Sequence, residues 1–426
     1  MMIWCFGGII RRHKTGPARM RVIPSLFFLL LGFAASPSPQ ATAGIGLDVE
    51  QFVMYDANAF RNSEQIPDLV FQPEVRLAYS TSSESNELRF AYDGTLTFFQ
   101  EYRDRRFQHH EISAKWSHAF REQGPDLSVL LTADTRINQN TYSEYDYRGG
   151  SGLVTLRFGQ GGGAHWLIKG SAQVQQYSRL REFSYEEYQL AGRMTRSFES
   201  RTTVIAQVQA GTKHYLEPML NRTVVQIPIP NTRQGKKYAN WRKKHGDQTP
   251  WTVERVIQTQ TAGKRMVQGA LSLRIAQALF HRSGVAVQGL IRRNTGAGGR
   301  YMTFQESGYE QDDPLFDDPY NYNSDEASLE FTQKLPWNVQ CKAGWEGLRK
   351  QYQHPVYDAT GAAVPGTRRK DGRNMFWISF DKGFSMHALG AEAGLSVTFS
   401  SLRNRSNDGY FDYRGGMAGA GFTMSF

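Results

Sequence analysis

Apolar side chains alternate with small or polar ones along most of this chain, and its last residues show the pattern most clearly. Side chains alternate across an extended strand with period two. Counted back from the end, one side of the stretch is apolar and the other small or polar: Phe426, Met424, Phe422, Ala420 and Ala418 against Ser425, Thr423, Gly421 and Gly419. The pattern predicts a strand with one wholly apolar face.

The same alternation recurs along the chain and predicts an all-β protein. Many of the segments run to about 12–18 residues, whereas strands of soluble proteins usually have about five or six. The sixteen expected strands are 45–57, 69–80, 87–101, 106–120, 126–141, 148–159, 164–178, 184–198, 202–216, 260–280, 284–296, 321–335, 337–351, 372–382, 387–402 and 409–426. A soluble β-sandwich gives the same alternation but does not explain this length.

The connections between these strands alternate between short turns and longer segments. The longest are 217–259, 297–320 and 352–371. An even number of strands with this alternation places both ends of the chain on one side of the sheet, as in bacterial membrane barrels with short periplasmic turns and long external loops.

Residues 1–43 have the pattern of a signal peptide, with a possible upstream extension. Met20 and Arg21 precede a short apolar run, and Ala41-Thr42-Ala43 is a small-residue site that predicts cleavage before Gly44. The apolar run is too short for a membrane helix. Without this leader only Cys341 is left as a cysteine, so no intramolecular disulfide is expected.

Composition agrees with a membrane barrel. The mean hydropathy of −0.53 looks soluble, but in such a barrel only every second strand residue faces lipid. The formal net charge of +10 falls to about +5 without the leader, too little to indicate nucleic acid as a partner.

The leader, the strand pattern and the terminal aromatic together resemble a Gram-negative outer-membrane β-barrel of the porin type. The resemblance implies a transmembrane antiparallel up-and-down barrel of about 16 strands over residues 44–426, with Phe426 read by the barrel-assembly machinery. It also implies contact with outer-membrane lipid and lipopolysaccharide and no cofactor, and it leaves the oligomeric state open. Aromatic residues near the strand ends are expected in two interfacial girdles: Phe120, Phe158, Phe198 and Trp337 at one end, Tyr102, Tyr142, Tyr145, Tyr215 and Tyr413 at the other.

The alternation predicts which charges face the inside. The expected inward cations are Arg76, Arg89, Lys115, Arg136, Arg157, Lys169, Arg193, Lys213, Arg274, Arg292, Lys334 and Lys342. The expected inward carboxylates are fewer: Glu74, Asp93, Asp134, Glu330, Glu346, Asp381 and Glu392. Because fixed charges focus the field in a confined pore, this excess predicts a mild preference for anions. Alternatively, the charges pair across strands and only hydrate the lumen.

Two loops carry concentrated charge. The basic loop 217–259 contains Lys236, Lys237, Arg242, Lys243 and Lys244. It predicts either a constriction or site for anionic sugars, or a solvated loop facing lipopolysaccharide. The acidic loop 297–320 contains Asp312, Asp313, Asp317 and Asp318. Its carboxylates suit Ca²⁺, but attraction between the two loops explains them equally well, and we expect no metal site.

No catalytic constellation emerges from the sequence. The histidines are dispersed, without an H-E-x-x-H motif or a cysteine partner for zinc. We therefore expect no enzyme, but a channel for passive diffusion of small hydrophilic solutes. The alternatives are a barrel belonging to an apparatus that exports polysaccharide, lipoprotein or electrons, and, with less support, a barrel hydrolase.

Overall fold

The structure is a computed structural model, which describes most of the chain after residue 41. The described ranges are 42–63, 65–121, 124–159, 163–228, 251–261, 265–296, 300, 315, 317–357, 363–386 and 390–426. The expected leader lies outside these ranges except for Thr42 and Ala43. Among the described residues, no helix has the length and apolar character needed to cross a membrane.

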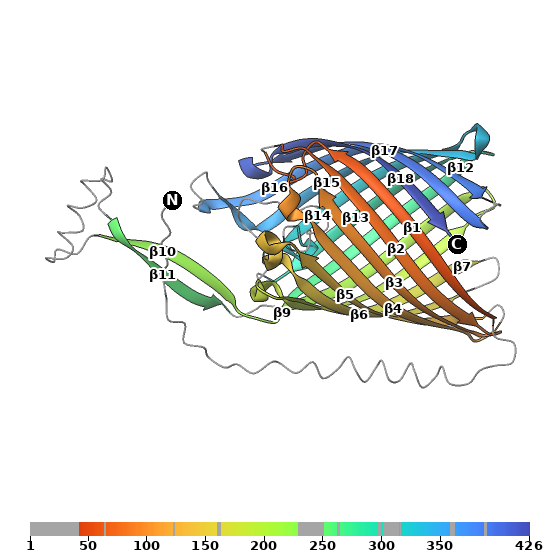
Figure 1. Cartoon of the computed structure of the whole chain (residues 1–426), viewed down its shortest axis with the longest axis horizontal. Helices are drawn as coiled ribbons and strands as arrows, with labels where there is room; N and C mark the ends of the chain where they lie inside the picture. Colours follow the sequence, from red (N-terminus) through yellow and green to blue (C-terminus); the bar gives the residue numbers. More distant parts are fainter. Residues whose placement is uncertain are drawn as a thin grey trace. The chain divides into compact units, whose positions relative to one another are not determined.

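Sixteen of the described strands close into one antiparallel barrel (Figure 1). Going round the barrel, each strand pairs with its neighbour in sequence, except that β12 pairs with β9 and β1 pairs with β18. The barrel strands are β1 (Thr42–Asp56), β2 (Asp68–Ser82), β3 (Asn86–Phe99), β4 (Phe107–Ala119), β5 (Asp126–Asn138), β6 (Tyr147–Phe158), β7 (Ala164–Tyr177), β8 (Tyr185–Ser197), β9 (Thr202–Tyr215), β12 (Met266–Phe280), β13 (Ser283–Thr295), β14 (Tyr322–Lys334), β15 (Val339–Tyr357), β16 (Ala363–Met386), β17 (Ala391–Ser406) and β18 (Tyr413–Ser425). The predicted sixteen-stranded barrel is confirmed.

The first and last strands close the barrel. The pairing of β1 with β18 runs from Asp48 opposite Ser425 to Asp56 opposite Met417. At its end, the Phe426 N–H donates to the Leu47 carbonyl at 2.9 Å, and the Leu47 N–H donates to the Phe426 carbonyl at 3.3 Å. From Leu47 to Asp56, β1 is therefore paired with β18 on one side and with β2 on the other, which closes the edge of the sheet.

Two of the expected loops contain strands. Residues 352–371 were predicted as a loop, yet β15 and β16 extend into them, with Gln351 opposite Lys370 and register shifts on both sides of Pro355. A proline can lie in a strand where the register is interrupted, so the proline did not end the pairing. In the other loop, 217–259, and the two residues after it, β10 (Met219–Pro228) and β11 (Trp251–Thr261) form a separate two-stranded sheet.

The outer face of the barrel is apolar and exposed. Leu273, Phe376 and Phe399 keep 47%, 59% and 48% of their exposure, and on each strand they alternate with inward residues. A belt of this kind is unfavourable in water, since larger exposed apolar patches belong at interfaces or in lipid. Closed antiparallel barrels with apolar outer faces are the β-structures that span membranes, so the described fold is that of a membrane-spanning barrel.

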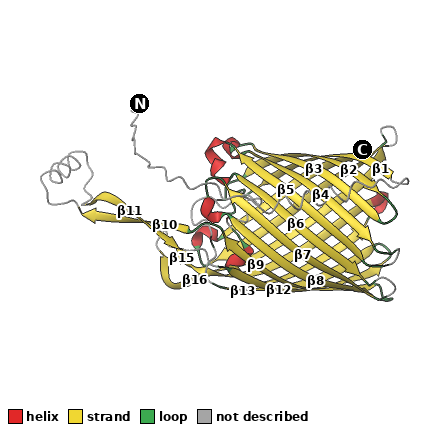
Figure 2. Ribbon diagram, turned by 90° about the horizontal axis from the view of Figure 1, so that it is seen from below, coloured by secondary structure: helices red, strands yellow, loops and turns green. Residues whose placement is uncertain are grey.

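Aromatic residues are buried inside the barrel at the end away from the C-terminus, which we call the mouth. Short 3-10 turns gather there between the strands (Figure 2). Three buried clusters line this end: Met54, Val70, Phe99 and Phe107; Tyr145, Tyr177, Phe183 and Leu315; Tyr185, Tyr215, Met266 and Tyr320. The mouth is therefore narrowed by packed side chains.

These clusters correct one prediction about aromatic girdles. Tyr145, Tyr215 and Tyr413 are buried at the mouth, and the other two expected there, Tyr102 and Tyr142, pack against buried clusters. Strand parity explains Tyr215, which lies two residues from the inward Lys213. At the opposite end, Phe120, Phe198 and Trp337 are exposed, as predicted, and Phe158 is partly exposed.

Glycines on β18 make room for an inward aromatic ring, which gives a test of the closure. A Cβ at Gly419 would lie 2.5 Å from the Phe52 ring. We expect Gly419→Ala to lower the free energy of unfolding by about 1–3 kcal/mol, because the ring must shift. Urea unfolding in lipid vesicles measures this. Gly170→Ala is the control, since open space surrounds its Cβ position, and equal effects of the two substitutions would contradict the packing described.

Candidate functional site

A segment between β13 and β14 folds into the mouth and contacts the inner wall. This inserted segment, residues 317–321, includes the 3-10 turn Pro319–Asn321, in which the Asp318 carboxylate accepts from the Tyr320 N–H at 3.0 Å. Its side chains meet inward residues of β9 and β15, strands well separated around the barrel. The segment therefore lies across part of the mouth.

Asp318 is held on β9. Its carboxylate accepts from Lys213 Nζ at 2.5 Å and from the Tyr215 hydroxyl at 3.1 Å. The Lys213 and Asp318 side chains keep only 3% and 2% of their exposure, and Lys213 Nζ also lies 3.7 Å from the centroid of the Tyr185 ring. The lysine charge is thus compensated by one carboxylate and by aromatic rings, of which Tyr185 is the nearest.

Asp317 is held on β15 in the same way. It accepts from Lys350 Nζ and, at 2.8 Å, from the Tyr352 hydroxyl. Lys350 Nζ lies 4.6 Å from the centroid of the Tyr322 ring. Both strands therefore present a lysine and a tyrosine two residues apart, with a second tyrosine on the preceding strand, so two like sites receive adjacent aspartates.

The protonation of Asp317 is tied to this contact. Burial by itself raises the pKa of this carboxyl group, but the charge of Lys350 and the hydrogen bonds from Lys350 and Tyr352 outweigh it and lower the pKa to about 2. The carboxylate is therefore ionised at neutral pH and stabilises the seated segment.

The backbone of the segment is also anchored. The Pro319 carbonyl accepts from Gln268 Nε2 at 3.0 Å and from Asn294 Nδ2 at 2.8 Å. The Tyr320 hydroxyl donates to Glu187 at 3.1 Å, over Gly211, where any Cβ would collide with that hydroxyl. The glycine thus allows the segment to lie close to the wall.

Leu315 and Arg300 extend the contacts of the segment around the mouth. Leu315 packs in the cluster of Tyr145, Tyr177 and Phe183. The Arg300 guanidinium donates to the Glu182 carbonyl, and the Arg300 carbonyl accepts from Asn321 at 2.8 Å. The mouth is therefore bridged from the β6–β8 side to β15.

The register places the twelve expected inward cations on one face of their strands, opposite the exposed apolar side chains. Several lie within ion-pair distance of a carboxylate: Arg76 with Asp93, Arg157 with Asp126 at 3.3 Å, Lys213 with Asp318 at 2.5 Å, Arg274 with Glu330 at 3.2 Å and Arg292 with Glu326 at 3.1 Å. Arg136 lies over the Phe107 ring at 3.8 Å. Within the described part of the chain, Arg89, Lys115, Lys169 and Arg193 form no ion pair.

Sequence reasoning missed several charged residues of the inner face. The register adds Lys350, Arg369 and Arg373 to the cations, and Asp48, Glu50, Glu87, Glu111, Asp126, Glu187, Glu326 and Asp371 to the carboxylates. Parity could have found Glu111, which lies four residues before Lys115 on the same strand. The additions remove the excess of inward cations on which the expected anion preference rested, so that preference stays a prediction without its original basis.

Inward acidic residues lie together on β1 to β5. One lateral row runs through Asp48, Arg76, Asp93, Glu111 and Asp134 on consecutive strands. Glu50 and Glu74 are opposite each other in the adjacent row. This wall is therefore mainly anionic, with Arg76 within it.

The two charged loops differ from expectation where they are described. Lys236, Lys237, Arg242, Lys243 and Lys244 lie outside the described residues, as do Asp312 and Asp313. Asp318 bonds to β9 and Asp317 to β15, so each of these two carboxylates has a partner on the wall, and attraction between the two loops stays a prediction. Among the described residues, no group of histidine, cysteine, aspartate and glutamate could hold a metal.

One Asp–His pair lies on the inner wall. His109 Nε2 is 3.6 Å from Asp134 Oδ2, which is too long for a hydrogen bond. Thr95, opposite His109 on β3, donates its hydroxyl to Glu74 at 3.4 Å. The hydroxyl opposite this histidine is therefore directed to a carboxylate and not to the imidazole.

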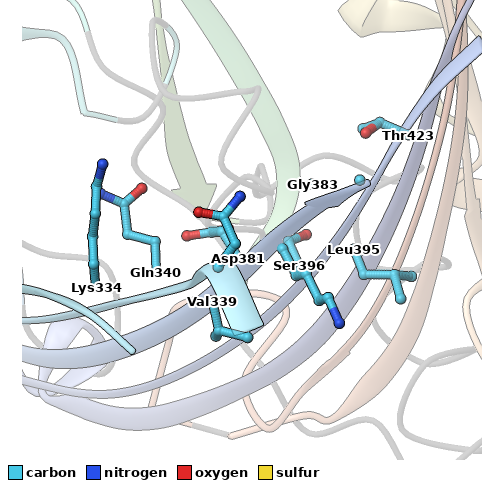
Figure 3. Close-up of a pocket in the computed structure, with 11 residues that line it drawn as sticks. Lys334, Val339, Gln340, Asp381, Gly383, Leu395, Ser396 and Thr423 are labelled. Carbon is cyan, nitrogen blue, oxygen red and sulfur yellow. The ribbon is translucent and has the colours of Figure 1, made fainter. Parts of the chain in front are cut away.

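A pocket lies at the other end of the barrel, near the C-terminal strand (Figure 3). Polar residues of five strands and a turn line it, among them Lys334, Gln340, Asp381, Ser396 and Thr423. Gly383 and Gly394 contribute no side chain there. The lumen is therefore not filled by side chains at this position.

No family model matches the chain, and no curated protein sequence matches it. By structure it is similar to OprD of Pseudomonas aeruginosa, with 8% identity, 90% of this chain and 95% of that chain covered, and a TM-score of 0.45. OmpT of Vibrio cholerae is 9% identical, with 92% of this chain and 99% of that chain covered and a TM-score of 0.40. P. aeruginosa OccK2 in complex with glucuronate is 8% identical, with 90% of this chain and 98% of that chain covered and a TM-score of 0.41. Because each TM-score is below 0.5, no functional conclusion follows from the likeness.

Removing one of the two ion pairs that hold the inserted segment on the wall should loosen the segment. Asp318→Asn leaves Lys213 buried without its carboxylate, which we expect to weaken the seated state by about 3–5 kcal/mol and to raise single-channel conductance in a planar bilayer. Asp325→Asn is the matched control, because Asp325 pairs with Arg293 at 2.7 Å on the outer face. A conductance unchanged by Asp318→Asn, in a folded barrel, would show that the segment does not limit the passage.

The segment should also respond to acid. When it leaves the wall, Asp317 regains an ordinary pKa of about 3.9. Because its seated pKa is lower, about 2, this carboxylate stabilises the seated state fully above about pH 4 and loses that effect as pH falls through about 2. Conductance measured from about pH 7 to about pH 2.5 should rise, and Asp317→Asn should lack that component. Identical pH profiles for the two proteins would exclude Asp317 as the group responsible.

Proposed function

We propose that this protein is an outer-membrane channel for the passive diffusion of small hydrophilic solutes. The observation that carries the proposal is the inner face of the closed barrel, which is polar and charged while the outer face is apolar. Water and solutes prefer such a lining, and it would be costly for a barrel whose interior only packed against itself.

The proposal gives the inserted segment the role of a constriction. It narrows the mouth through specific bonds to β9, β12, β13 and β15, while the opposite end contains a polar pocket. We further propose that the mouth faces the outside and that the end bearing Phe426 faces the periplasm, as expected for barrels with long external loops.

Charge selectivity should come from two sectors of the wall. Arg89 and Lys115 lie opposite each other on β3 and β4, and neither forms an ion pair with any described residue. The acidic row of β1 to β5 lies on the same wall, nearer the mouth. We propose a weak overall charge selectivity, in which the basic sector attracts anions and the acidic sector attracts cations.

The Asp–His pair on the inner wall gives no support to a hydrolase with a hydroxyl nucleophile. His109, in the wall region of the acidic row, has the Asp134 carboxylate 3.6 Å away, but the hydroxyl opposite this histidine belongs to another hydrogen bond. A nucleophile must be within reach of its base, so we propose transport and no enzymatic activity.

Planar-bilayer recording tests the channel and its selectivity together. In a salt gradient, the purified protein should form stable open channels. The double substitution Arg89→Gln with Lys115→Gln should shift the reversal potential towards cation selectivity. Glu111→Gln with Asp134→Asn should shift it towards anion selectivity. The field of a wall charge in a confined pore causes both shifts. Arg293→Gln, on the outer face, is the control.

A silent bilayer from a correctly folded barrel would overturn the proposed channel. Open channels whose reversal potential ignores both pairs of substitutions would instead show that ions do not pass along these walls.

A further inference from the structure

Cations gather on the outer face of β15 to β18 at the mouth. Arg349, Arg368, Lys370, Arg403, Arg405 and Arg414 are all exposed there, on the strand face that carries Phe376 and Phe399 further down. They lie directly beyond the apolar belt, at the level where lipid headgroups meet a barrel. The inner-wall charges and the proposed channel do not account for them.

Three of these cations surround an open floor, which we call the cation cradle: Arg349, Gly372, Lys370 and Arg405. Arg349 is opposite Gly372, and Gly372 is opposite Arg405, so the two arginines are separated by two strand spacings of about 4.8 Å each. No atom lies within 4 Å of a Cβ built on Gly372. Lys370 is two residues along β16 on the same face.

The described carboxylates near the cradle do not neutralise it. Asp325, opposite Arg349, bonds instead to Arg293 at 2.7 Å. Asp371 faces inward and pairs with Arg369. Among the described residues, the side chains of Arg349, Lys370 and Arg405 form no ion pair.

The flank of the cradle adds to the positive charge. Arg403 is directly opposite Arg414, and like charges in this position destabilise a sheet. Asp412 compensates Arg403 at 2.6 Å, and Arg414 is left with a hydrogen bond to the neutral Gln65 amide at 3.2 Å. The surface is therefore suited to an external anion.

We propose that the cation cradle binds a phosphate group of a phosphorylated glycolipid anchored in the outer leaflet. Guanidinium groups bind phosphate oxygens in a bidentate manner, the glycine floor admits a group between them, and the apolar belt below accommodates acyl chains. The inference rests on the proposed outer-membrane location and orientation, but not on channel activity.

The rest of the rim offers a matched control. Arg148 on β6 is also exposed, outward and at the mouth, but its lateral neighbours are Thr135 and Gln176. It keeps one positive charge at the same level without a second cation across the strands.

Lipid titration followed by native mass spectrometry tests the proposal on the full protein in a mild neutral detergent. The probes are bisphosphorylated lipid A, its dephosphorylated form and inorganic phosphate. Arg349→Gln with Arg405→Gln should weaken lipid A binding at least about tenfold, because two charge-assisted contacts are lost. Arg148→Gln should bind as the unchanged protein does, and Arg349→Lys with Arg405→Lys should fall between.

Gly372→Leu provides a second variant that leaves every charge in place. It fills the floor of the cradle, and the open space there should let it fold, so it should weaken lipid A binding to a similar extent. Both variants should keep the conductance of the unchanged protein, which separates this site from the channel.

Three results would overturn the proposal. Lipid A bound equally well by the double arginine variant or by Gly372→Leu would remove the cradle as the site. Equal binding of the dephosphorylated lipid would remove phosphate as the recognised group. Displacement of lipid A by an equal concentration of inorganic phosphate would show a site for free phosphate and not for a membrane lipid.

Discussion

The whole structure depends on the backbone pairing that closes β1 against β18. A closed sheet has no free edge, so every barrel strand is hydrogen-bonded on both sides. Once this register is set, parity decides the environment of each side chain, because a slip of one residue would exchange the two faces. The small inward residues of β18 belong to the same constraint: Gly419 and Gly421 leave the space that the Phe52 ring occupies. The closure, the chemistry of the inner face and the apolar outer face are therefore consequences of one pairing.

At the mouth, two charged side chains of the wall bind the inserted segment. Lys213 was expected to attract solutes, but it and Lys350 are each compensated by an aspartate of the inserted segment and by a tyrosine ring. A buried ion pair gains little over an apolar contact, yet it makes the loss of either partner expensive. The arrangement therefore specifies where the segment lies more than it stabilises the barrel. Because two similar lysine–tyrosine sites bind adjacent aspartates, they fix both the position and the direction of the inserted segment.

Charge is distributed differently on the two faces of the sheet. Inside, several arginines are matched by carboxylates on neighbouring strands, as Arg274 is by Glu330 and Arg292 by Glu326. Outside, the described cations of β15 to β18 exceed the carboxylates that could pair with them. Paired charges hydrate a lumen at little cost, whereas unpaired charges at the membrane surface are stabilised by an anion from the surroundings. This difference between the two faces is the basis of the two proposals, solute passage inside and lipid binding outside.

The sequence alone determined the approximate strand positions, the barrel and the face of most wall residues, because period-two alternation over long segments is a local signal. It also predicted the terminal strand and the opposite faces of that strand on which Phe422 and Gly421 lie. It could not show that β15 and β16 extend past Pro355, since pairing with a partner strand outweighs the local preference of a proline. The wall residues that bind Asp317 and Asp318 were likewise decided only by tertiary structure. Lys213 and Lys350 are far from these aspartates in sequence, and only the closed barrel brings them to the same mouth.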